Sequence, residues 1–157
     1  MILNSFRHTS SGGGGGTPGV ISTGGTPLQA NTGLPAGFFF DGDTVSSMYS
    51  GTNPRIGYDF GSGVTRTITG FSIWAGIDDR LWSLSTDPIT VKGSNTGFLA
   101  GDATTIHTVN SGTISAAVIT KYTYNHTASA PFRYVWLEFS TTDTNDTPIP
   151  EVEFLGY

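Results

Sequence analysis

The chain has 157 residues, of which 12% are charged and 12% aromatic, and its formal net charge is −5. This length supports one domain with a sizeable core. The acidic balance, with Lys and Arg scattered singly, excludes a nucleic-acid partner and an anionic membrane surface, because both require clustered positive charge. No stretch is apolar enough for membrane insertion, and without cysteine there are no disulfides or zinc thiolates.

Residues 1–36 differ in composition from the rest of the chain. They contain the run Gly12–Gly16, a second glycine pair at Gly24–Gly25 and several Pro and Thr residues. Such a segment buries too little apolar surface to offset its ordering entropy. We therefore expect an extended arm over residues 1–36, with residues 1–8 as a docking peptide, and a folded domain over residues 37–157.

From residue 38 onward the hydrophobic residues alternate with polar ones, and turn signals recur at short intervals. The strongest segment is 132–140, in which Val135, Leu137 and Phe139 face one way while Tyr134 and Trp136 face the other. The remaining strands are expected near residues 56–60, 71–75, 89–94, 104–109, 114–120 and 152–154. This pattern predicts an all-β fold, an antiparallel β-sandwich of the jelly-roll type. Trp74 and Trp136 are expected to serve packing.

Two short acidic motifs lie far apart in the sequence, in a chain where only 12 residues are Asp or Glu. Asp41 and Asp43 flank a glycine, with Ser46 just downstream, and Glu151 and Glu153 lie near the C-terminus. Carboxylates and hydroxyls in this arrangement suit a hard cation, and a terminal strand can close the site. The alternative is an Asx turn at Asp41–Gly42 without a metal.

The order and spacing of several motifs resemble discoidin domains, also called factor V/VIII type C domains, and family-32 carbohydrate-binding modules. These families share a galactose-binding-like jelly roll. The motifs occupy residues 40–47, 56–61, 68–73, 89–97, 132–139 and 150–156. The resemblance implies a structural calcium held by Asp41 or Asp43, by Ser46, and by Glu151 or Glu153.

The resemblance also implies a ligand face on loops at one rim of the sandwich, here residues 49–55, 76–84 and 141–148. An indole, a guanidinium and carboxylates suit a sugar, because they offer a flat apolar face and paired hydrogen bonds. Trp82 has the alternative role of a loop anchor. The expected ligand-binding residues are Tyr49, Asn53, Arg55, Asp78, Asp79, Arg80, Trp82, Asp143 and Asn145.

Catalysis is not expected. The three histidines are scattered, with His107 expected on an exposed strand face, and adjacent Asp78 and Asp79 diverge in a strand, which does not suit a glycosidase pair. The segment beginning at Met1 lacks the features of a secretory signal, and with the glycine-rich arm it resembles small structural proteins of tailed bacteriophages.

These features lead to the hypothesis of a non-catalytic virion surface protein, on head or tail, that forms homo-oligomers on the particle. Its residues 1–36 would dock to other virion proteins, and its sandwich would bind host-surface carbohydrate. One alternative is a purely structural decoration or cement protein that binds no glycan. Another is an extracellular carbohydrate-binding module.

Overall fold

A computed structural model of the chain describes residues 17–44, 53–75, 81–84, 86–115, 119–140 and 149–157. Nearly all regular structure in these residues is β-strand. The strands are β1 Gly19–Val20, β2 Thr26–Ala30, β3 Arg55–Asp59, β4 Arg66–Ala75, β5 Leu81–Ser83, β6 Ile89–Ser94, β7 Thr104–Val109, β8 Thr113–Ser115, β9 Thr120–Asn125, β10 Pro131–Phe132, β11 Tyr134–Phe139 and β12 Val152–Gly156. One short 3₁₀ helix, η1, spans Ala36–Phe39. No helix within the described ranges is long and apolar enough to cross a membrane.

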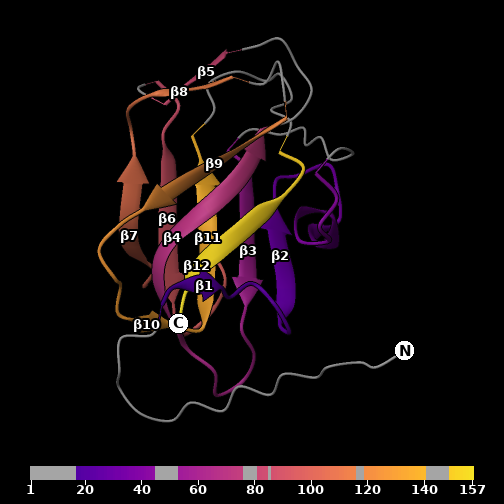
Figure 1. The fold of residues 1–157 in the computed structure, drawn as a ribbon. Helices are drawn as coiled ribbons and strands as arrows, with labels where there is room; N and C mark the ends of the chain where they lie inside the picture. Colours follow the sequence, from indigo (N-terminus) through magenta and orange to yellow (C-terminus); the bar gives the residue numbers. More distant parts are fainter. Residues whose placement is uncertain (1–16, 45–52, 76–80, 85, 116–118, 141–148) are drawn as a thin grey trace.

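Two antiparallel sheets pack face to face, which confirms the predicted β-sandwich (Figure 1). The first sheet has the order β1-β12-β4, and β4 continues the sheet by pairing with both β10 and β9. The second has the order β2-β3-β11-β6-β7, and β5 and β8 form a small separate pair. The predicted strand at residues 114–120 is divided, because β8 joins β5 whereas β9 joins β4.

The core lies between the two sheets and follows the alternation read from the sequence. Phe71 and Ile73 of β4 are fully buried, as are Val135, Leu137 and Phe139 of β11. Removing such side chains from water is the main favourable term in folding. The alternate residues of β11 therefore lie on the outer face of the second sheet.

The sandwich does not begin at residue 37 as expected, because part of the segment assigned to the extended arm, from residue 19 onward, belongs to its sheets. β1 pairs with β12 in one sheet, and β2 pairs with β3 in the other, so this segment connects both layers of the sandwich. Pro27 within β2 is tolerated because β2 is an edge strand of its sheet. At Gly25 the backbone N–H donates to the Tyr58 hydroxyl at 2.8 Å, and a Cβ would collide with the Asp59 carbonyl. Gly25, whose residue type suggested flexibility, here permits the close approach of the chain to β3.

One end of the sandwich gathers strand termini from both sheets. The Phe139 N–H donates to the Pro54 carbonyl, and the Ser140 N–H donates to the Pro88 carbonyl, each at 3.1 Å. In the first sheet the Trp74 N–H donates to the Glu151 carbonyl at 3.0 Å. We call this the loop end; it lies at the top of Figure 1.

Candidate functional site

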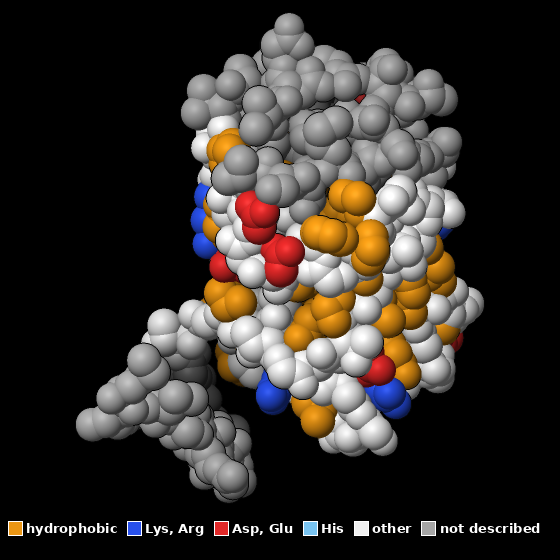
Figure 2. Space-filling view, turned by 90° about the vertical axis from the view of Figure 1, so that its right-hand side faces the viewer, with side chains coloured by type: hydrophobic (Ala, Val, Ile, Leu, Met, Phe, Trp, Pro, Cys, Tyr) orange, Lys and Arg blue, Asp and Glu red, His pale blue; other side chains and the backbone are white. Residues whose placement is uncertain are grey.

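The two acidic motifs meet near the loop end, as the sequence predicted. The carboxylate of Glu151 accepts a hydrogen bond from the Gly42 N–H at 3.0 Å across 109 residues of sequence. Glu151 is only 7% exposed. This burial, together with the neighbouring carboxylates of Asp41 and Glu153, raises the pKa of Glu151 to about 7. Figure 2 shows acidic side chains gathered on the side of the molecule that carries η1.

The other carboxylates of this group already have partners. Asp41 accepts from the Asp43 N–H at 2.8 Å, which confirms an Asx turn, and Gly42 within it has φ 82°. Glu153 pairs with Lys121 at 2.7 Å. The described residues contain no group of three or more metal-ligating side chains, and Ser46 lies outside them. Hard cations such as calcium bind carboxylate oxygens, so the side chains of Asp41 and Glu151 are suitable ligands for the predicted metal.

Most of the predicted ligand-binding residues lie outside the described part of the chain. Asn53 is exposed, has φ 51°, and its carbonyl accepts from the Asn31 side-chain amide at 3.4 Å. Arg55 begins β3. Trp82 belongs to β5, but its side chain is not among those described. Those that lie entirely outside are Tyr49, Asp78, Asp79, Arg80, Asp143 and Asn145.

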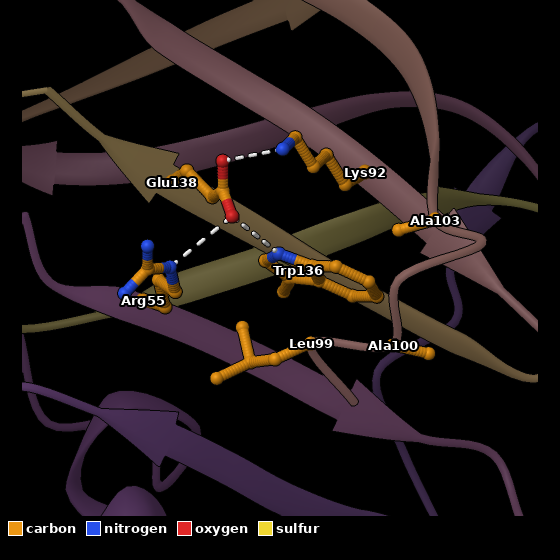
Figure 3. A pocket seen from close by; sticks show the side chains of 7 residues that line it. All are labelled: Arg55, Lys92, Leu99, Ala100, Ala103, Trp136 and Glu138. Carbon is orange, nitrogen blue, oxygen red and sulfur yellow. Dashed lines mark hydrogen bonds and ion pairs between the residues drawn. The ribbon is translucent and has the colours of Figure 1, made fainter. Parts of the chain in front are cut away.

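Arg55 takes part in a charged cluster on the outer face of the second sheet. It lies opposite Glu138 in the pairing of β3 with β11, and its Nε donates to Glu138 Oε1 at 3.1 Å. Lys92 of β6 approaches Glu138 Oε2 at 2.8 Å. The Trp136 indole N–H donates to Glu138 Oε1 at 3.2 Å. One carboxylate therefore connects three strands (Figure 3).

The cluster lines a pocket of about 240 Å³. Trp136 forms its floor and is only 1% exposed, because Phe98 meets the indole edge-on with ring centroids 5.6 Å apart. The expected packing role of Trp136 is thereby confirmed. Leu99 is 41% exposed and presents an apolar wall. The full lining is Arg55, Lys92, Leu99, Ala100, Ala103, Trp136 and Glu138 (Figure 3).

The electrostatics of the pocket keep Glu138 ionised. Burial alone would raise the pKa of Glu138, but the hydrogen bonds from Lys92, Trp136 and Arg55 outweigh it and hold that pKa below its usual value. The side chains of Arg55, Lys92 and Glu138 are 30%, 29% and 22% exposed. All three charges are thus accessible to a solute.

Sequence reasoning missed Lys92, Leu99 and Glu138. Lys92 and Glu138 lie within the motifs at 89–97 and 132–139, but nothing in those motifs or around Leu99 marks any of the three as ligand-binding. The alternation of β11 does place Glu138 on the outer face with Trp136. Only the strand register places Lys92 beside Trp136 and Arg55 beside Glu138.

Two of the scattered histidines meet at an open edge of the sandwich. His107 of β7 and His126, just after β9, stack with ring centroids 5.1 Å apart. His107 is half-buried rather than on a freely exposed face. Burial, with a smaller effect of His126, lowers the pKa of His107.

The fold matches solved carbohydrate-binding modules. No protein-family model and no curated protein matches the chain. A family-62 module of Clostridium thermocellum Xyl5A is 22% identical with a TM-score of 0.62, covering 85% of this chain and 94% of that one. The family-32 module of C. perfringens NanJ, solved with galactose, is 12% identical with a TM-score of 0.63, covering 88% and 99%. The family-32 module of AlyQ, solved with 4,5-unsaturated mannuronic acid, is 18% identical with a TM-score of 0.56, covering 86% and 95%. At these identities the likeness shows the fold, a galactose-binding-like β-sandwich.

Proposed function

We propose that this protein is a non-catalytic carbohydrate-binding module that holds a sugar residue in the pocket over Trp136. The main support for this proposal is the composition of the pocket. The guanidinium of Arg55, the ammonium of Lys92 and the carboxylate of Glu138 lie there beside the apolar side chain of Leu99. A pyranose has C–H faces that need an apolar surface and hydroxyls that need charged or polar partners. The pocket offers both at one accessible place.

The structural neighbours support this proposal. Three modules of the same fold, from different carbohydrate-active proteins, are described as carbohydrate-binding, and two were solved with a sugar or a sugar acid. The predicted residues Asn53 and Arg55 lie at the loop end, so a longer glycan in the pocket can extend toward that end of the sandwich.

A structural calcium is part of the proposal. Its support is the buried Glu151, whose pKa is raised to about 7 by burial and by nearby Asp41 and Glu153. A hard cation would neutralise this concentration of negative charge. Asp41 and Glu151 are the described residues that would hold it, while Asp43, Ser46 and Glu153 stay as further predicted ligands. The ion would tie the start of β12 to the turn at Gly42.

The proposal also includes a location for the protein, on the surface of a virion. The run Gly12–Gly16 precedes β1 and is the composition of a flexible tether. Many tethered copies on a particle would strengthen a weak sugar contact through avidity. Residues 1–18 would then dock to the particle and the pocket would face host glycans. A decoration protein without glycan binding and an extracellular module are the competing assignments.

Binding of the full chain to an array of glycans, displayed as multivalent complexes, tests the proposal. Leu99→Ala removes part of the apolar wall and should weaken binding to the best glycan about fivefold, which corresponds to roughly 1 kcal/mol of lost contact. Val20→Ala, at an exposed residue of β1, is the matched control and should bind like the wild type. Uniform silence of the array, or equal binding by both variants, would refute the pocket as the site.

A further inference from the structure

The pocket carries more positive charge than its own carboxylate neutralises. The structure describes five basic residues, and two of them, Arg55 and Lys92, line this one pocket. Both approach the same carboxylate, that of Glu138. The pocket therefore holds a net charge of +1 on a chain whose net charge is −5.

Two other cations of the described residues, Arg133 and Lys121, each pair with a single carboxylate. Arg133 forms a bidentate pair with Asp59 at 2.8 and 2.9 Å. Lys121, on the outer face of the first sheet, pairs with Glu153 and lies over the Trp74 ring at 4.4 Å. Glu138 differs from these carboxylates because it pairs with two cations, Arg55 and Lys92.

The pocket is rich in hydrogen-bond donors that are still available. Arg55 reaches Glu138 through Nε only, and within the described residues its two terminal nitrogens make no other bond. Lys92 has three N–H groups, one of which faces Glu138. Glu138 already accepts three hydrogen bonds of about four that a carboxylate can take. The pocket therefore has N–H groups of Arg55 and Lys92 available to a ligand, whereas the Glu138 carboxylate can accept about one more hydrogen bond.

This imbalance selects among sugar groups. A hydroxyl both donates and accepts, whereas a carboxylate only accepts and can take two parallel hydrogen bonds from a guanidinium. We infer that the pocket prefers an acidic sugar residue, a uronic acid, with its carboxylate between Arg55 and Lys92 and its C–H face against Leu99. The inference rests on the proposed function and specifies the class of ligand.

Matched oligosaccharides test this preference. Oligomers of galacturonate, glucuronate and mannuronate are each compared with the carboxyl-reduced oligomer, which has the same linkages but no charge. Titration of the full chain should show roughly tenfold tighter binding to at least one acidic form. Raising the salt to about 0.5 M should reduce this ratio, since the charges are partly exposed. The net charge of −5 would by itself repel an acidic ligand, so a general charge effect has the opposite sign.

Three variants locate the effect. Arg55→Met and Lys92→Met should each abolish most of the preference for the acidic form. Lys121→Met removes the same charge from the opposite sheet and should leave the preference unchanged. Equal or tighter binding of the reduced oligomers, or a preference that survives both pocket variants, overturns the inference but leaves carbohydrate binding standing. If no acidic or neutral glycan binds at all, the proposed function fails with it.

Discussion

Glu151→Gln is the substitution with the most informative expected effect on stability. In the metal-free protein the pKa of Glu151 is raised from 4.5 to about 7, chiefly by burial and further by the nearby Asp41 and Glu153 carboxylates. Between these two values the folded protein binds a proton that the unfolded chain releases. Stability of the metal-free protein must therefore fall as the pH rises through this window.

The difference between 4.5 and about 7 corresponds to a loss of at most about 3 kcal/mol at pH 8. Glutamine stays neutral throughout and its amide oxygen can still accept the Gly42 N–H. Glu151→Gln should therefore equal the wild type below about pH 4 and exceed it in metal-free buffer near pH 8. Calcium should reverse this order, because it stabilises the ionised wild-type carboxylate and finds a poorer ligand in the amide.

Urea unfolding followed by tryptophan fluorescence measures these differences, with a chelator present and then with excess calcium. Asp102→Asn is the control, since it removes a carboxylate that lies outside the acidic group and accepts hydrogen bonds from Ser94 and Thr96. It should lose a little stability rather than gain it. Parallel pH profiles for wild type and Glu151→Gln in chelator would refute the electrostatic reasoning, and an unchanged melt after metal removal would count against calcium.

Two further predictions concern the frame of the sandwich. Gly156→Ala places a Cβ against the Thr67 carbonyl and should lower the free energy of unfolding by about 2 kcal/mol. Gly19, its partner in the β1–β12 register, has open space around the position of a Cβ, so Gly19→Ala should change stability little. Equal losses of stability in the two variants would contradict this account. Asp59→Asn breaks the bidentate pair with Arg133, whose hydrogen bond chiefly lowers the pKa of Asp59. Because that stabilisation is present above the ordinary Asp pKa and lost as the pH falls through the lowered value, the variant should melt earlier near pH 7 and match the wild type near about pH 2. A melting-temperature difference independent of pH would show that the pair does not act through charge.

The sandwich could be predicted from the sequence because successive side chains of a strand point to opposite faces, so alternating apolar residues indicate a strand with one face in the core. In β11 every second residue is large and apolar, and Val135, Leu137 and Phe139 do face the core. The Asx turn at Asp41 was likewise readable, since Asp followed by Gly bonds locally to its own backbone. The strands β1 and β2 were missed because Gly19 in β1 and Pro27 in β2 oppose strand formation locally, while edge pairing with β12 and β3 outweighs that preference.

The candidate site divides in the same way. Sequence alone singled out Arg55 and Asn53, through the family resemblance, and placed Glu151 with Asp41. It left Lys92, Leu99 and Glu138 unmarked.

Composition and alternation by themselves determined that this chain forms an acidic, cysteine-free antiparallel sandwich, because each strand's burial pattern is local information. Tertiary structure alone decided that Arg55 and Lys92 share the Glu138 carboxylate over Trp136. That arrangement depends on the register of three strands, and β3 and β6 are each separated from β11 by at least 40 positions in the sequence. Such a register is set by the packing of the whole sheet, and no single segment encodes it.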